Sequence, residues 1–318
     1  MNLNLVHVMQ IETSPLISVV IPTYNHADFL KVAITSVAEQ TYQNFEIVIV
    51  DNHSNDHTNE VVDSFNDDRI HVYKINNNGI IAASRNLGVD HAKGDWIAYL
   101  DSDDYWYPTR LQCLVDSMDG DVKYDVISTD EYKTNNLTGK KTKLIYGPLK
   151  GYKYRSLLLY GNRLSPSASL VRKEFLLENE VRFNESSDFV TVEDYDYWLQ
   201  LALSDATFKF VRSFEGEYLV HGGNTSGQIA LHKRNSLNLL KHHIFNVQKF
   251  EADKETLWRN MQGVLSIRES FQHLKSRDLA LFLKVFVASC KASKYFVCRW
   301  VLYRFKFFFK HIFCSLKM

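Results

Sequence analysis

GDWIAYLDSDD, residues 94–104, joins an apolar run to a cluster of carboxylates. Trp96 to Leu100 has the length and the aromatic, apolar character of a buried strand. Asp101, Asp103 and Asp104 follow it at once. In open α/β sheets, ligands bind at the carboxyl ends of the strands. The segment therefore predicts a central strand that delivers carboxylates to a ligand-binding edge.

The three clustered carboxylates are expected to have a neutralising partner. Carboxylates that are close together and partly buried repel one another unless a cation or hydrogen-bond donors compensate them. Carboxylate oxygens suit Mg²⁺ and Mn²⁺, which keep coordination positions open for phosphate oxygens. We therefore interpret Asp101-Ser102-Asp103 as a metal–diphosphate site. The alternative is a solvated acidic turn that starts a helix, with Asp104 as its N-cap.

Further strand and helix patterns alternate before this segment. The expected strands are Ile17–Ile21, Phe45–Val50 and Ile70–Ile75, and the expected helices start near Phe29, Thr58 and Ile80. This alternation favours an α/β fold with a largely parallel, Rossmann-like sheet flanked by helices. A chain of 318 residues with 45% apolar composition can bury the core of such a fold.

Polar side chains follow the predicted strands where each one ends. Asn25, Asp51 and Asp101 occupy such positions, and a parallel sheet gathers the carboxyl ends of its strands at one edge. Arg85, on the preceding helix, could reach a phosphate there, because a guanidinium forks onto phosphate oxygens. Taken singly, each has an ordinary alternative: Asn25 a turn, Asp51 a helix cap, Arg85 a surface cation.

Two later positions carry titratable groups. Glu193-Asp194 opens a helical pattern, where acids favour the helix dipole. The functional interpretation is that one of them is a general base. His221 ends the strand candidate that starts at Tyr218. It is either a turn residue or a third metal ligand.

These motifs together resemble the family 2 glycosyltransferases of GT-A fold. The resemblance covers approximately residues 15–230 with its order intact, which is more specific than any single motif. It is carried by VVIPTYN (19–25), Asp51, Asn78-Gly79, Arg85-Asn86 with Gly88, Gly94-Asp95, DSDD (101–104), FNE (183–185), EDYDYWL (193–199) and Tyr218…His221…Ser226.

The resemblance implies an inverting transferase that uses a nucleotide-diphosphate sugar, with a UDP-sugar the expected donor, and Mn²⁺ or Mg²⁺. The implied donor-binding residues are Pro22, Tyr24, Asn25, Asp51, Arg85 and Asp101. Asp103 would be the principal metal ligand, with Asp101 and His221 completing the site. Asp194 would deprotonate the acceptor hydroxyl, and Glu193 would support it.

One motif departs from the family pattern. Many relatives carry Asp-Asp-Gly-Ser after the second strand, whereas this chain has Asp51-Asn52-His53-Ser54. The glycine position bears on the turn, because glycine adopts a positive φ without strain. The turn and its nucleoside contacts therefore do not follow from the resemblance.

The last segment, residues 291–318, changes in composition. It is rich in Lys, Arg and aromatic residues and contains no Asp or Glu. At helical spacing, Arg299, Lys306 and Lys310 share a stripe opposite Phe305 and Phe308. This pattern predicts an amphipathic helix that binds an anionic membrane surface. A helix packed on the protein or on a partner is the alternative.

The expected domains are a catalytic domain (1–230) and a helical C-terminal region (231–318). The catalytic domain divides into a nucleotide-binding half (about 15–105) and an acceptor half (106–230). Thirty-seven basic residues balance thirty-seven acidic ones, so global charge gives no case for nucleic acid. Four cysteines without metal spacing favour a reducing compartment.

These features predict a cytoplasmic enzyme held peripherally at the inner face of the cell membrane. It would glycosylate a lipid-linked glycan or a polysaccharide precursor. A nucleotidyltransferase and a non-catalytic sugar-nucleotide-binding protein are the alternatives. A processive synthase is disfavoured, because Phe296 precedes Arg299-Trp300 where those enzymes carry glutamine.

Overall fold

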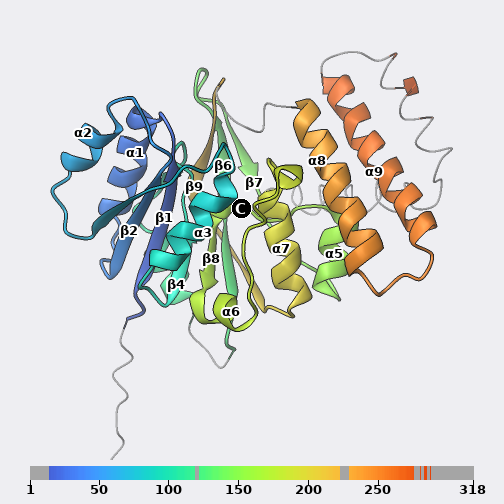
Figure 1. Cartoon of the computed structure of the whole chain (residues 1–318), viewed down its shortest axis with the longest axis horizontal. Coiled ribbons are helices and arrows are strands. Elements are labelled where there is room, and N and C mark those ends of the chain that lie inside the picture. Colours follow the sequence, from blue (N-terminus) through green and yellow to red (C-terminus); the bar gives the residue numbers. More distant parts are fainter. Residues whose placement is uncertain are drawn as a thin grey trace, which may run out of the picture. The chain divides into compact units, whose positions relative to one another are not determined.

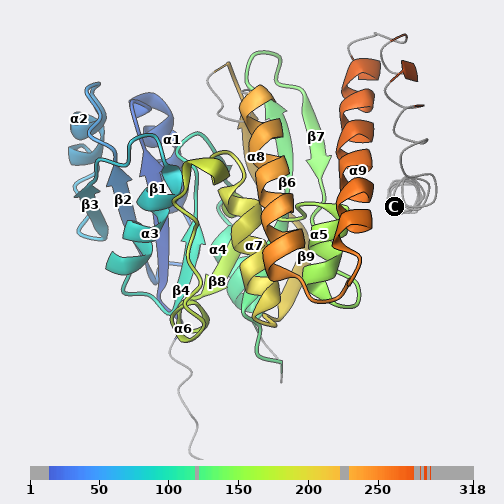
Figure 2. The same ribbon diagram turned by 45° about the vertical axis from the view of Figure 1, so that its right-hand side comes forward.

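The computed structural model describes residues 14–118, 122–222 and 229–275, together with residues 280, 283, 284 and 287. Within these residues, nine strands form one sheet in the order β3-β2-β1-β4-β8-β6-β9-β5, and β7 pairs with β6 (Figures 1 and 2). The strands are β1 (Ile17–Thr23), β2 (Phe45–Asp51), β3 (Ile70–Lys74), β4 (Trp96–Tyr99), β5 (Tyr105–Trp106), β6 (Val126–Asn135), β7 (Lys141–Leu144), β8 (Ser169–Arg172) and β9 (Phe208–Val220).

The first half of the sheet is parallel. β1 pairs in parallel with both β2 and β4, and β2 pairs in parallel with β3. Every residue of β1, β2 and β4 is buried, as expected for apolar strands covered on both faces. The predicted α/β fold is confirmed, and the predicted parallel pairing holds from β3 to β4, whose other neighbour β8 is antiparallel.

Helices follow most of these strands. They are α1 (Ala27–Ala38), α2 (Thr58–Asp63), α3 (Ile81–His91), α4 (Arg110–Asp116), α5 (Lys153–Tyr160), α6 (Lys173–Glu178), α7 (Glu193–Leu203), α8 (Ile229–His242) and α9 (Lys254–Lys275). Shorter turns are η1 (Pro166–Ala168), η2 (Ser187–Phe189) and the π-helical η4 (His243–Val247).

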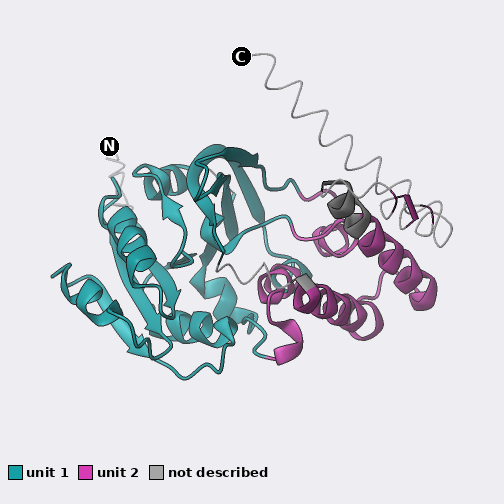
Figure 3. Cartoon of the chain, turned by 90° about the horizontal axis from the view of Figure 1, so that it is seen from above, with its two compact units in different colours: residues 1–148, 163–185, 200–227 teal, residues 149–162, 186–199, 228–318 magenta. Residues whose placement is uncertain are grey.

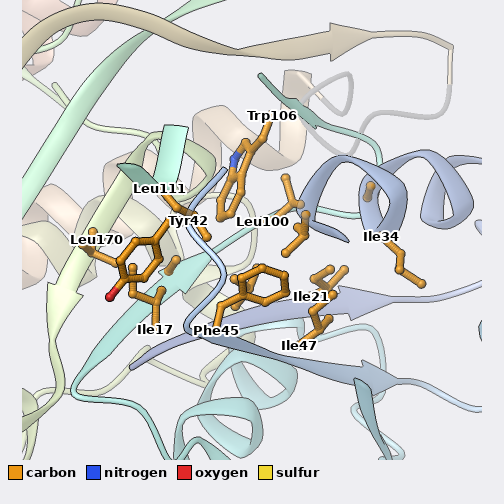
Figure 4. Packing of buried hydrophobic residues seen from close by; sticks show 14 of the residues in the cluster. Ile17, Ile21, Ile34, Tyr42, Phe45, Ile47, Leu100, Trp106, Leu111 and Leu170 are labelled. Atoms are coloured by element: carbon orange, nitrogen blue, oxygen red, sulfur yellow. The ribbon is translucent and has the colours of Figure 1, made fainter. Parts of the chain in front are cut away.

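An apolar cluster packs β1 and β2 against α1 and reaches Trp106 (Figure 4). Ile21, Ile47 and Ile34 are fully buried in it. α3 packs on β1 through Gly88, where a Cβ would lie 2.3 Å from Val20 Cγ1. Glycine therefore permits the close approach of this helix to the sheet.

Beyond β4 the sheet is mixed. β8 lies antiparallel to β4 and β6, whereas β6 and β9 are parallel. β6 and β7 form a hairpin in which Thr134 pairs with Lys141.

The chain divides into two compact units (Figure 3). Unit 1 comprises residues 1–148, 163–185 and 200–227 and holds the sheet, whereas unit 2 comprises 149–162, 186–199 and 228–318. The predicted boundary near residue 230 stays a prediction, and the predicted amphipathic tail (291–318) lies outside the described residues. Among the described helices, none is long and apolar enough to cross a bilayer.

Unit 2 contains its own buried polar chain. Tyr154 Oη lies 3.0 Å from His243 Nδ1, and His243 Nε2 lies 2.8 Å from Asp196 Oδ1. All three side chains are buried. Tyr195 Oη also donates to the Leu157 carbonyl at 2.8 Å. These bonds tie the first turn of α7 to α5 and η4.

Candidate active site

The sheet of unit 1 brings the predicted strand-end residues to one edge. Thr23 at the end of β1 is in register with Asp51 at the end of β2, and Val20 is in register with Tyr99 of β4. Asn25 and Asp101 are each the second residue after one of these strands, β1 and β4. Their gathering at the carboxyl edge is as the strand pattern predicts.

The loops after β1 and β2 are joined by hydrogen bonds. Asn25 Oδ1 accepts from the Asn55 amide at 2.8 Å, and the Asn25 amide donates to Ser54 Oγ at 2.8 Å. His53, at the glycine position of the family motif, has φ 54°. Histidine is among the residue types that tolerate the left-handed region. The turn thus keeps, with histidine, a conformation that glycine adopts without strain.

Asp51 is fully buried and held by several donors. Its Oδ1 accepts from the Ser54 amide at 3.0 Å, and its Oδ2 lies 2.5 Å from Lys74 Nζ. Lys74 Nζ also donates to Asn59 Oδ1 at 2.8 Å. A hollow of about 290 Å³ lies beside this group, lined by Ile49, Asp51, Thr58, Asn59, Val62, Asp63, Val72 and Lys74. The sequence did not indicate Lys74, because its pairing depends on the register of β2 with β3.

The other two donor-site residues from the first strand differ in exposure. Pro22 is buried within β1, whereas Tyr24 is 54% exposed. The exposed Tyr24 ring, beside the carboxyl edge of the sheet, is available to stack on a nucleobase.

Arg85 pairs with Asp101 across the edge. Arg85 Nη2 lies 2.7 Å from Asp101 Oδ1, and the Arg85 side chain is only 3% exposed. Its guanidinium carbon also lies 5.2 Å from the centre of the Phe183 ring. The side chain of Asn86, the next residue, fixes the Phe183 backbone: its Oδ1 accepts from the Phe183 amide and its Nδ2 donates to the Phe183 carbonyl. A buried cation is therefore fixed beside the first carboxylate of the DSDD motif.

Asp103 and His221 form the second pair. His221 Nε2 lies 2.9 Å from Asp103 Oδ2, and the two side chains are 12% and 17% exposed. The His221 ring stacks on Phe29, with 4.6 Å between ring centres. Burial raises the pKa of Asp103, and the charge of Asp101 raises it further. β9, which ends at Val220, therefore places the next residue, His221, beside Asp103.

Asp104 has a structural role that the sequence did not predict. It is buried rather than a solvated N-cap, and it leads into β5 and not into a helix. Its Oδ1 accepts from the Leu219 amide at 3.1 Å, and its Oδ2 from Ser167 Oγ at 2.5 Å. Burial and the charges of Asp103 and Asp101 raise the pKa of Asp104 well above its usual range. The alternative of an acidic turn capped by Asp104 is wrong.

The Asp103–His221 pair fits a divalent cation. The 2.9 Å between His221 Nε2 and Asp103 Oδ2 is the length of a hydrogen bond. It is also close to the distance of about 3 Å between adjacent ligand atoms of an octahedral Mg²⁺ or Mn²⁺. Within the described part of the chain, no three His, Cys, Asp or Glu side chains gather in a metal-binding group. Such ions commonly take one or two carboxylates and complete their shell with water and phosphate oxygens. The triad with Asp101 stays a prediction.

The predicted base lies at the first turn of α7, in unit 2. Asp194 Oδ2 accepts from Asn162 Nδ2 at 2.8 Å, and Glu193 beside it is buried. Thr191, just before the helix, has φ 71°, which is strained for a β-branched residue. His232 Nδ1 contacts the Thr191 carbonyl at 3.1 Å. Strain of this kind clusters at functional sites, and the role of Asp194 as a base stays a prediction.

Comparison with known proteins decides the family. The model of "Glycosyl transferase family 2" matches residues 18–178, which is about half of the chain and includes β1 to β4 with the DSDD motif. The chain belongs to glycosyl transferase family 2. One family relative is the Escherichia coli UDP-Glc:alpha-D-GlcNAc-diphosphoundecaprenol beta-1,3-glucosyltransferase WfaP. It is 28% identical over 214 residues, which make up 66% of this chain and 80% of that protein.

Two solved structures are similar to this chain in fold. TarS of S. aureus in complex with UDP-GlcNAc has a TM-score of 0.57 at 17% identity, covering 86% of this chain and 91% of that one. The mannosyltransferase PcManGT of Pyrobaculum calidifontis, in complex with GDP-Man and Mn²⁺, has a TM-score of 0.58 at 15% identity, covering 89% and 76%. With the family match, these likenesses confirm the predicted GT-A fold.

Proposed function

We propose that this glycosyltransferase is an inverting, metal-dependent enzyme that moves a sugar from a nucleotide-diphosphate donor to a glycan or lipid-linked glycan. The observation that carries the proposal is the pairing of Arg85 with Asp101 and of His221 with Asp103 at one sheet edge. A cation, a carboxylate and a His–Asp pair at the carboxyl ends of strands suit a diphosphate better than a neutral ligand.

On the donor side, Pro22, Tyr24 and Asp51 hold the nucleoside, with Asn25 fixing the loop beside them. Arg85, already buried beside Asp101, offers its guanidinium to the diphosphate. Asp103 and His221 hold Mn²⁺ or Mg²⁺, which when bound neutralises charge on the departing diphosphate. Structures of TarS with UDP-GlcNAc and of PcManGT with GDP-Man and Mn²⁺ support this donor chemistry, and a UDP-sugar is the donor we expect.

On the acceptor side, Asp194 accepts the proton of the attacking hydroxyl. Asn162 donates to one of its oxygens and so orients the carboxylate. Glu193 supports Asp194 from the same helical turn, where the helix dipole favours ionised acids. A base that activates the acceptor directly allows a single displacement, which inverts the anomeric centre.

The acceptor we propose is lipid-linked or a polysaccharide precursor at the inner face of the cell membrane. WfaP, which is 28% identical, acts on a sugar carried by diphosphoundecaprenol. The basic, aromatic segment 291–318 supports attachment to an anionic surface. The enzyme would then work as a cytoplasmic protein on acceptors held in the adjacent leaflet.

The decisive experiment is a screen of sugar nucleotides with the full chain and Mn²⁺, measuring binding by calorimetry and slow hydrolysis by release of the nucleotide. We expect one donor to be hydrolysed, and EDTA to stop the reaction. Binding without hydrolysis or transfer would favour a non-catalytic sugar-nucleotide-binding protein. Release of pyrophosphate from a nucleoside triphosphate and a sugar phosphate would favour a nucleotidyltransferase.

A further inference from the structure

The β6–β7 hairpin lies at the same edge of unit 1 as the Asp103–His221 pair. Asn135 at the end of β6 is in register with Val220 at the end of β9, and the Asn136 amide donates to the Val220 carbonyl at 3.0 Å. His221 is the next residue along the chain. A surface that contacts the hairpin tip (residues 136–139) therefore lies close to the candidate metal site.

The tip presents an apolar side chain to solvent. Leu137 is 90% exposed. Asn135 Oδ1 accepts from the amides of Leu137 and Thr138 at 3.1 and 2.9 Å, and Gly139 closes the turn with φ 66°. A single exposed leucine is ordinary on a protein surface. Here, however, a hydrogen-bonded turn holds it outward, and the surroundings are strongly charged.

Lysines surround this tip. The stretch from residue 132 to 149 contains no Asp or Glu, and four of its lysines are exposed, namely Lys133, Lys140, Lys141 and Lys143. Glu217 of β9 pairs with Lys141 at 2.5 Å. Lys143 Nζ lies over the Phe214 ring, 5.1 Å from its centre, in a cation–π contact, and the residue is exposed. The hairpin thus combines excess positive charge with an apolar tip.

We propose that this hairpin docks on an anionic phospholipid bilayer, with Leu137 entering the headgroup region and the lysines facing lipid phosphates. An exposed apolar residue in a stretch that holds four lysines and no acid of its own matches the chemistry of that surface. Docking would present the Asp103–His221 edge to an acceptor held in the membrane. This last consequence rests on the proposed function, whereas the docking itself does not.

Charge removal tests the docking. Binding of the full chain is measured by cosedimentation with vesicles of phosphatidylglycerol and phosphatidylcholine, and with phosphatidylcholine alone. The Lys140→Gln/Lys143→Gln variant should bind the anionic vesicles roughly 25-fold more weakly, since each lysine near such a surface contributes about 5-fold. Lys93→Gln/Lys123→Gln is the matched control, because these exposed lysines precede β4 and β6 at the opposite edge. The control should bind as the wild type does.

A local probe separates the hairpin from any other membrane-binding segment. Leu137→Trp in the full chain should add fluorescence that brominated lipids quench when anionic vesicles are present. Leu177→Trp is the control, since Leu177 is 64% exposed on α6. α6 follows β8, which is antiparallel to β4, and it therefore begins at the edge of the sheet opposite the Asp103–His221 pair. The control's added fluorescence should not be quenched.

The outcomes distinguish this inference from the proposed function. If the Lys140/Lys143 variant binds vesicles as tightly as its control, or if the probe at position 137 is not quenched while the protein is bound, the hairpin does not dock. Donor hydrolysis by the wild type without vesicles is measured in parallel. Its absence with every donor would contradict the proposed function but would leave the docking result standing.

Discussion

A substitution at Asp194 separates an enzyme from a binding protein at the scale of one residue. Asp194→Asn keeps the shape of the side chain and its ability to accept a bond from Asn162, but removes its basicity. Base catalysis typically contributes about 10²–10⁴-fold, so the rate of sugar transfer should fall by that order while donor affinity, measured by calorimetry, stays unchanged. Glu193→Gln is the matched control and should cost less. If the two effects are reversed, Glu193 is the base; if neither variant slows transfer, both acids only start the helix.

The His221–Asp103 pair is the residue-scale test of metal binding. His221→Ala should weaken the Mn²⁺ titration more than it weakens nucleotide affinity measured without metal, and Asp103→Asn should abolish metal-dependent nucleotide binding. Because folding raises the pKa of Asp103, its ionised form costs folding free energy at neutral pH. Asp103→Asn should therefore not lower the melting temperature. An unchanged Mn²⁺ titration in both variants would remove the pair from the metal site.

The strand-end positions of three candidate site residues followed from the sequence, but their hydrogen-bond partners did not. Asn25, Asp51 and Asp101 were placed correctly because strand ends are visible as breaks in apolar runs. The sequence did not predict the pairing of Lys74 with Asp51. Nor did it predict the hydrogen bonds between the Asn86 side chain and the Phe183 backbone. Such pairings join distant parts of the chain, so no local pattern encodes them.

At the scale of elements, Asp125 joins three strands of the sheet at one point. It precedes β6, its Oδ1 lies 2.7 Å from Arg172 Nη2 of β8, and its Oδ2 accepts from the Thr207 amide before β9 at 2.8 Å. Burial alone would raise the pKa of Asp125, but the hydrogen bonds from Thr207 and Arg172 outweigh it, and the pKa is lowered from its usual value of 3.8. The carboxylate therefore stabilises the fold above pH 3.8, and this contribution is lost as the pH falls through the lower, folded-state pKa.

Asp125→Asn should accordingly lower the free energy of unfolding by about 2 kcal/mol at pH 7, since it removes the buried charge partner of Arg172 and leaves that guanidinium paired only with the exposed Glu174. Urea denaturation at pH 7 and at pH 3 measures the effect, which should shrink at the lower pH. Asp68→Asn, at an exposed position, is the control. A penalty that is the same at both pH values would mean that the charge of Asp125 does not matter.

The elements themselves were predicted unevenly. β1, β2 and β4 are nearly continuous apolar runs, and their parallel pairing followed from the helices between them. The pairing of β6 with β9 was not predicted, because a bulged register between distant strands leaves no periodic signal. β5 is only two residues long, which is too short for any pattern to reveal.

At the scale of the whole molecule, two segments are candidates for the membrane attachment that we propose. The tail, residues 291–318, carries seven Lys and Arg residues and no acid, whereas the hairpin offers four lysines, one of them paired with Glu217. Basic residues near an anionic surface contribute about 1 kcal/mol each. The tail should therefore supply most of the affinity, and the hairpin should set which edge of unit 1 faces the lipid.

Deleting residues 291–318 should thus weaken binding to anionic vesicles far more than Lys140→Gln/Lys143→Gln does. The truncated protein should still hydrolyse donor slowly, because the strand ends of unit 1 are intact. Its remaining vesicle binding should vanish when the two lysine substitutions are added, and all binding should decline with salt because exposed charges are screened. Sedimentation over a salt series measures these effects, with circular dichroism to verify folding. If the truncated protein unfolds, or if the full chain ignores anionic vesicles at low salt, the tail is a structural helix and not a membrane anchor.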